Sequence, residues 1–183
     1  MSRQLRLVTL VLAVLVLAAC GSSDQPGSVS WRNISVELPN DWYLVEEAED
    51  RLSIANHPLD PADDEPDDAG PDGDVVAMYF TYEPGSTPDD WRRFVDEQGA
   101  TLETDDQLTL DGEVPATRLV YQYETNGVPT REMVVVVPSR EVVALALPIP
   151  AAGDHTAPEA FLEHIETFLD VLDNLRFGAP VLD

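Results

Sequence analysis

The side chain with the best-defined chemistry in this 183-residue chain is a thiol at the end of an apolar run. Cys20 is the only cysteine, and it closes the apolar run over residues 7–19 with Leu-Ala-Ala directly before it. Two arginines precede that run, and no acidic residue does. A short positive segment, an apolar stretch of about 7–15 residues and small residues before a cleavage point are typical of a secretory signal peptide. We therefore expect residues 1–19 to be removed during export.

The residues around Cys20 also resemble a known modification signal. Leu-Ala-Ala-Cys, followed directly by a polar Gly-Ser-Ser, resembles the lipobox of bacterial lipoproteins. The resemblance implies that the sulfur receives diacylglycerol, that Cys20 becomes the new N-terminus, and that two or three acyl chains such as palmitate anchor it. More than one chain gives stable membrane attachment. An uncleaved transmembrane helix is the alternative, but it needs about 17–25 apolar residues and this run is shorter.

Acidic residues dominate the charge of the chain. There are 35 Asp and Glu against 10 Lys and Arg, with a formal net charge of −25. Such a charge repels the phosphates of nucleic acids, so we exclude nucleic-acid binding. It also repels an anionic bilayer, so the acyl chains alone would hold the protein at the membrane. The acids are scattered, which favours solubility in a salty medium over a surface for cations or a cationic partner.

Residues 59–74 hold eight of these acids together with prolines at every fifth position, Pro61, Pro66 and Pro71. Like charges interrupted by proline cannot bury a face, so we expect a solvated acidic loop. A calcium loop is the alternative, because calcium binds several carboxylate oxygens. The segment lacks the ligand spacing and closing glutamate of an EF-hand.

The histidines offer little evidence of catalysis. His57 precedes a proline, His155 lies beside an expected helix start, and His164 lies at the boundary of the last expected helix. Zinc-protease, nucleophile-elbow and phosphate-loop motifs are absent from the sequence. We expect no catalytic, cofactor-binding or metal-binding residues. An envelope enzyme is the alternative, and it would bring polar groups with perturbed pKa values together in one cleft.

The rest of the chain predicts one α+β domain over residues 31–177, between a flexible tether over 20–30 and a C-terminal tail over 178–183. Periodicity and turn signals predict a twisted, mainly antiparallel sheet of about six or seven strands with two helices packed on it. The expected strands lie over residues 31–38, 42–45, 75–82, 116–123, 133–137 and 142–147, with shorter ones near 52–54 and 108–110.

Two helices complete this expectation. Thr87 followed by Pro88 predicts an N-cap and first turn, and Gly99 predicts the end of that helix. Trp91, Phe94 and Val95 are spaced to face the core. A second capping box opens at Thr156. Its helix is expected to turn six apolar residues inward, namely Phe161, Ile165, Phe168, Leu169, Leu172 and Leu175.

Three stretches in this order resemble the PsbP-like fold, and in particular the LpqN-type small lipoproteins of high-GC Gram-positive bacteria. They are residues 31–42, 111–116 and 173–177, and the likeness spans nearly all of 31–177. The resemblance implies a twisted antiparallel sheet with helices on its faces and a binding or accessory role without a catalytic centre. It supplies no functional side chains, and the long acidic loop departs from its pattern.

These observations lead to one hypothesis about function. We expect a monomeric, lipid-anchored, non-enzymatic accessory lipoprotein on the extracytoplasmic face of the cell membrane. Cys20 carries the membrane attachment. The ligand is either an envelope protein or a small apolar molecule held between sheet and helix. An uncharacterised envelope enzyme and a calcium-binding surface domain remain the alternatives.

Overall fold

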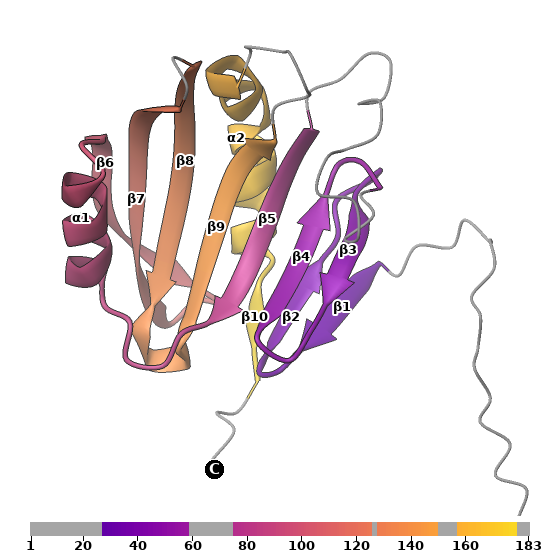
Figure 1. Ribbon diagram of the computed structural model, residues 1–183. Helices are drawn as coiled ribbons and strands as arrows, with labels where there is room; N and C mark the ends of the chain where they lie inside the picture. Colours follow the sequence, from indigo (N-terminus) through magenta and orange to yellow (C-terminus); the bar gives the residue numbers. More distant parts are fainter. Residues whose placement is uncertain (1–26, 59–74, 126–127, 150–156, 179–183) are drawn as a thin grey trace, which may run out of the picture.

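The computed structural model describes residues 27–58, 75–125, 128–149 and 157–178. Within these ranges the chain forms ten strands, two α-helices and one short 3-10 turn (Figure 1). The strands are β1 (Ser28–Trp31), β2 (Ile34–Glu37), β3 (Tyr43–Glu47), β4 (Arg51–Ala55), β5 (Val75–Tyr82), β6 (Thr101–Leu110), β7 (Val114–Thr125), β8 (Val128–Val137), β9 (Val142–Ile149) and β10 (Arg176–Phe177). The helices are α1 (Pro88–Glu97) and α2 (Ala157–Asp173), and the 3-10 turn is η1 (Pro138–Arg140).

The strands form two antiparallel sheets. The larger has the order β3-β4-β5-β9-β8-β7-β6, and the smaller has the order β1-β2-β10. Successive hairpins pair β6 with β7, β7 with β8 and β8 with β9, while β5 pairs with β9 on its other side. This architecture confirms the expected α+β class with a mainly antiparallel sheet, although a second small sheet was not anticipated.

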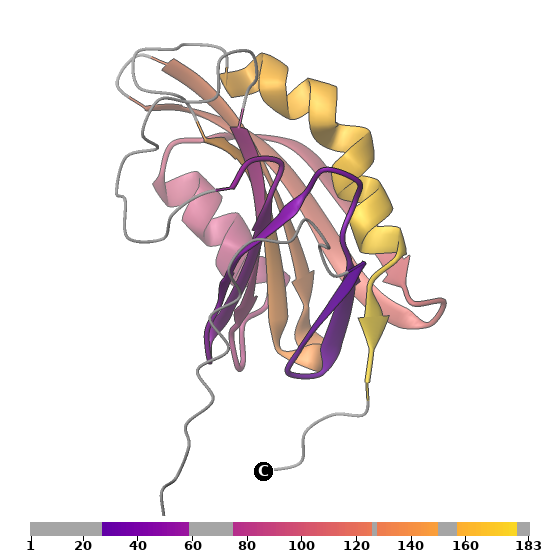
Figure 2. The same ribbon diagram turned by 90° about the vertical axis from the view of Figure 1, so that its right-hand side faces the viewer.

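The two helices lie on opposite faces of the seven-stranded sheet (Figure 2). Helix α2 contacts β5, β8 and β9, and the small sheet lies beside it on the same face. The main core fills the space between these two layers, with Phe80, Phe161 and Phe168 fully buried. Helix α1 contacts β6 and β7 on the other face, where a smaller cluster forms around Val95 and Tyr121.

Helix α1 begins as the sequence predicts. The Thr87 side chain accepts a hydrogen bond from the Asp90 N–H, and the Asp90 carboxylate accepts one from the Thr87 N–H. Val95 is buried and Trp91 packs against the same cluster. The inward position expected for Phe94 is wrong, because this side chain is 44% exposed. The helix contacts β6 and β7 at the end of the sheet, and Val95 rather than Phe94 faces the sheet.

The N-terminal region departs from the expected boundaries. The tether predicted over 20–30 is wrong at its C-terminal end, because Ser28–Trp31 pairs with Ile34–Glu37 and Val29 is buried. The single strand expected over 31–38 is also wrong. The chain reverses at Arg32, whose φ is 50°, and forms a hairpin in which Trp31 pairs with Ile34. The folded domain therefore begins before residue 31.

Most other elements agree with the sequence. The strand expected over 75–82 is β5 and lies inside the larger sheet, and the strands expected over 133–137 and 142–147 pair as β8 and β9. The predicted inward face of the last helix is confirmed, with four of its six residues buried and two half-buried, although Leu175 lies two residues beyond the end of α2. The second capping box at Thr156 lies outside the described residues.

Candidate functional site

The residues singled out in the sequence for chemistry fall in different places. Cys20, the acidic segment over 59–74 and His155 lie outside the described residues. The His57 ring is hydrogen-bonded to the Pro58 carbonyl through Nδ1, with 3.0 Å between the atoms. His164 lies on α2 and lines a groove. None of the helices in the described ranges has the length and hydropathy of a membrane span.

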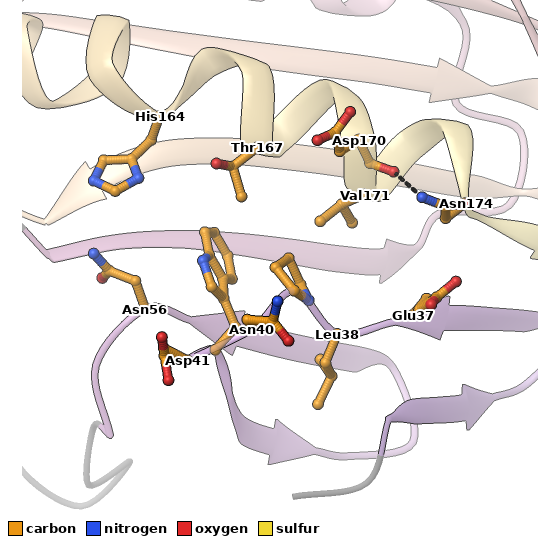
Figure 3. Close-up of a pocket in the computed structure, with 12 residues that line it drawn as sticks. Glu37, Leu38, Asn40, Asp41, Asn56, His164, Thr167, Asp170, Val171 and Asn174 are labelled. Atoms are coloured by element: carbon orange, nitrogen blue, oxygen red, sulfur yellow. Dashed lines mark hydrogen bonds between the residues drawn. The ribbon is translucent and has the colours of Figure 1, made fainter.

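The groove runs between α2 and the loop that joins β2 to β3 (Figure 3). It is an open hollow of about 620 Å³. One wall carries side chains from α2, and the facing wall carries the end of β2, the following loop and the residue after β4. The residues that line it are Glu37, Leu38, Pro39, Asn40, Asp41, Trp42, Asn56, His164, Thr167, Asp170, Val171 and Asn174.

The loop wall is shaped by a tight turn from Pro39 to Trp42. The Trp42 N–H donates to the Pro39 carbonyl oxygen at 3.2 Å. Asp41 has a left-handed φ of 63°, a conformation in which Asp and Asn are enriched among non-glycine residues. The turn predicted from Pro39-Asn40-Asp41 is thereby confirmed, and it holds the Asp41 carboxylate at the groove.

Trp42 forms part of the groove and is only 3% exposed. Its indole ring meets Phe168 edge-on, which fixes the ring against the core. An indole is a hydrogen-bond donor only, and within the described ranges no residue accepts a bond from this N–H. Every fully buried side-chain nitrogen in those ranges has a hydrogen-bond partner. Because this N–H has none, it cannot be fully buried and must reach solvent. The hollow that Trp42 lines is the groove.

Three carboxylates line the same groove as Trp42. Glu37, Asp41 and Asp170 all line the groove and are exposed. None of them forms an ion pair among the described residues. Because their negative charges are not neutralised within that part of the chain, the groove carries a negative potential that favours cationic groups.

The arginines explain why these carboxylates stay unneutralised. The chain has no lysine, and its eight arginines after residue 30 all have partners elsewhere. Among the described residues there are seven ion pairs, and none involves a groove carboxylate. The arginines in these pairs are Arg51, Arg92, Arg93, Arg118, Arg131 and Arg176. Arg32 stacks on Tyr82, and Arg140 donates to the Gly178 carbonyl. Arg176 pairs with Asp111, and it lines a neighbouring hollow together with Glu37.

Amide groups add hydrogen-bonding capacity to the groove. The Asn174 side chain donates to the Asp170 carbonyl at 3.0 Å, and the Asn56 carbonyl oxygen accepts from the Val76 N–H at 2.9 Å. Both bonds tie groove residues to regular elements, which fixes their positions. Asn40, His164 and Thr167 also line the groove. A ligand in this hollow therefore meets donors and acceptors as well as charge.

A second hollow of about 310 Å³ adjoins the first, because Glu37 and Asn174 line both. Gly27 and Ser28 also line it. These are the first two residues that the structure describes. The groove therefore lies at the end of the domain where the chain enters from Cys20.

A separate polar cluster lies on the face of the sheet that α1 covers. The hydroxyls of Tyr121 and Tyr123 both donate to the Glu132 carboxylate, with 2.7 Å for the Tyr121 bond. Burial, followed by the nearby Glu132 charge, raises the pKa of Tyr121 well above its usual value. Tyr121 belongs to the buried cluster around Val95, so these groups stabilise the sheet rather than line a hollow.

The sequence did not indicate the groove as a site. The sequence predicts residues 37–42 only as a strand end and turn, and Asp170 only as a solvent-facing position on the last helix. The signal that could have found them is the polar spacing of His164, Thr167, Asp170 and Asn174, which places one polar stripe along α2. In the described ranges no cluster of three or more His, Cys, Asp or Glu side chains could hold a metal ion.

No family model matches this chain, and no curated protein matches it. Among solved structures, the fold is similar to a crystal structure of a Pseudomonas aeruginosa protein of unknown function. The two sequences are 13% identical and the TM-score is 0.47, over 80% of this chain and 92% of that chain.

Proposed function

We propose that this protein is a lipid-anchored, non-catalytic binding domain of the cell envelope. The observation that carries the proposal is the sequence Leu17-Ala18-Ala19-Cys20, which closes a short apolar run and precedes polar residues. Acylation of the Cys20 thiol holds the domain at the extracytoplasmic face of the membrane.

The binding role is supported by the groove between α2 and the β2–β3 loop. This hollow is open, polar and acidic, which suits a protein ligand. Helix α2 packs on the sheet through Phe161, Phe168 and Leu172, which are at most 1% exposed. Apolar side chains pack together in the described part of that interface, and the groove is acidic, so we favour a protein partner over a small apolar ligand.

The experiment is detergent-phase partitioning of the protein expressed in a bacterium that processes lipoproteins. We expect the wild-type protein to enter the detergent phase, and Cys20→Ala to accumulate as precursor or to appear in the aqueous phase. Ser22→Ala is the matched control, because it changes a small polar residue two positions away and leaves the thiol in place. Detergent-phase partitioning of processed Cys20→Ala protein equal to wild type would refute the anchor.

A further inference from the structure

We propose that the acidic groove over Trp42 binds a basic peptide segment of another envelope protein. The groove would accept arginine or lysine side chains at its carboxylates and a main-chain carbonyl at the indole N–H. This inference rests on the proposed function for its cellular setting. The binding chemistry itself rests on three observations that concern Trp42, the charges and the position of the groove.

The first observation is that the indole N–H of the buried Trp42 side chain has no hydrogen-bond acceptor among the described residues. Trp42 lines the groove and is 3% exposed, yet its N–H has no acceptor among the described residues and must reach solvent. We infer that it does so at the groove. A carbonyl oxygen of an extended peptide is an acceptor of the right kind. Because so little of the ring is exposed, no face is free to stack on a sugar, which argues against a carbohydrate ligand.

The second observation is charge. Glu37, Asp41 and Asp170 line one hollow without an ion pair among the described residues, while all eight arginines after residue 30 have partners elsewhere. No arginine of the described residues lines the groove itself, and Arg176 lines only the adjoining hollow. Guanidinium and ammonium groups are the complementary ligands, and carboxylates bind them through charge-assisted hydrogen bonds. The same charges repel anionic lipid headgroups, so the favoured ligand is a protein and not the bilayer surface.

The third observation is position. Gly27 and Ser28 line the hollow that adjoins the groove, and only seven positions separate Gly27 from Cys20. A fully extended chain spans at most about 3.6 Å per residue. Gly27 therefore lies within about 25 Å of an acylated Cys20. A groove so close to the anchor meets segments that emerge from the same membrane, so we assign the ligand to a basic segment of a membrane-bound partner.

The test is binding of a defined peptide to the purified full-length lipoprotein in neutral detergent micelles. The probe is a fluorescein-labelled ten-residue peptide of alternating arginine and alanine, and anisotropy measures its affinity at two salt concentrations. We expect saturable binding that weakens with salt, and no binding of the peptide in which glutamate replaces arginine.

Two variants locate the binding site. Asp41→Asn with Asp170→Asn removes two groove charges, and asparagine tolerates the left-handed φ at position 41. We expect this double variant to bind the arginine peptide at least about fivefold more weakly. Asp96→Asn with Glu97→Gln is the matched control, because it removes the same charge from exposed residues of α1, on the opposite face of the sheet.

Trp42→Phe removes the N–H and keeps an aromatic ring. The loss of one hydrogen bond should weaken peptide binding about threefold to tenfold. Thermal unfolding checks that each variant is folded, and if Trp42→Phe does not fold, the double variant decides the question. Equal affinity of the groove and control double variants would overturn the proposal, because it would mean binding through net charge alone. No binding of the arginine peptide to the wild type would also overturn it.

This assay measures binding in micelles and does not depend on membrane attachment in cells. If the arginine peptide binds but Cys20→Ala partitions like the wild type, only the lipid anchor at Cys20 is refuted. If Cys20→Ala leaves the detergent phase but the wild-type protein does not bind the arginine peptide, only the proposed peptide ligand of the groove is refuted.

Discussion

The indole ring of Trp42 meets the ring of Phe168 edge-on, with the centroids 6.1 Å apart and the ring planes at 90°. Edge-to-face aromatic pairs at this separation are favourable. The contact joins the loop before β3 to the inner face of α2, so the groove is supported directly by the main core. A change in the core beneath Phe168 should therefore affect both the stability of the domain and the environment of Trp42.

Phe168→Ala tests this support. Phe168 is fully buried, so its loss should lower the free energy of unfolding by about 3–5 kcal/mol. Urea unfolding followed by tryptophan fluorescence measures the effect. Leu162→Ala is the control on the same helix, because Leu162 is 53% exposed and its truncation should change stability by less than about 0.5 kcal/mol. Equal losses for the two variants would mean that α2 does not pack as described.

Asp111 should hold the C-terminal strand in place. Its carboxylate accepts a hydrogen bond from the Phe177 N–H at 2.9 Å, which ties β10 to the β6–β7 hairpin. Asp111→Ala removes this acceptor and places alanine at a φ of 48°, so we expect a loss of about 1–3 kcal/mol. Hydrogen exchange of the Phe177 amide should accelerate.

Asp111→Asn is the matched control for this turn. Asparagine keeps an acceptor oxygen and tolerates the left-handed conformation, so the exchange rate should stay close to wild type. Unchanged protection of the Phe177 amide in Asp111→Ala would contradict the proposed role of the carboxylate.

Acid should weaken the contact between α1 and β6. The guanidinium of Arg92 donates to both oxygens of Asp105 at 2.8 Å, and these bonds lower the pKa of the Asp105 carboxyl. A carboxyl with a lowered pKa in the folded state adds stability above its unfolded pKa of about 3.9, and this contribution is lost as pH falls through the folded value. Asp105→Asn should therefore be less stable than wild type at pH 7, with the difference shrinking towards pH 3.

Asp96→Asn is the comparison for this acid effect, because Asp96 is exposed and has no ion pair among the described residues. Its removal relieves repulsion in a chain of net charge −25, so it should not lower stability at pH 7. The measurement is the urea midpoint of each protein across the pH range. A constant difference between wild type and Asp105→Asn at every pH would contradict the ion-pair explanation.

Alkali should weaken the sheet at Tyr121. Burial raises the pKa of this hydroxyl above the usual value of about 10, with a further contribution from Glu132. Above about pH 10 the unfolded chain loses this proton before the folded chain does, so stability falls as pH rises. Tyr121→Phe has no such group, so its stability should fall less steeply above pH 10. Parallel curves for the two proteins in alkaline denaturation would contradict this account.

The sequence predicted those elements whose signals are local. Val75–Tyr82 is apolar on both faces, which correctly indicated an interior strand. Thr87 and Pro88 correctly marked the start of α1. The sequence does not predict the hairpin at Arg32, because arginine rarely adopts a positive φ. The apolar alternation of the following strand also starts directly after it, so no turn signal interrupts the pattern.

Features that depend on distant contacts could not be read from the sequence. Phe94 has the spacing of a core residue, but α1 contacts only the end of the sheet, at β6 and β7, and Phe94 stays 44% exposed. The groove combines residues 37–42 with a stripe on α2, and only the tertiary fold brings these segments together. The solvent-reaching N–H of Trp42 likewise follows from packing and has no sequence signal.

The most direct test of the central claim, lipid anchoring through Cys20, is the mass of the mature N-terminus. The protein should be isolated from membranes and the fragment that contains Cys20 measured by mass spectrometry. We expect a fragment that begins at Cys20 and carries a diacylglycerol group on sulfur, with or without a further acyl chain on the new amino group. A fragment that retains residues 1–19, or a Cys20 with a free thiol, would contradict the account.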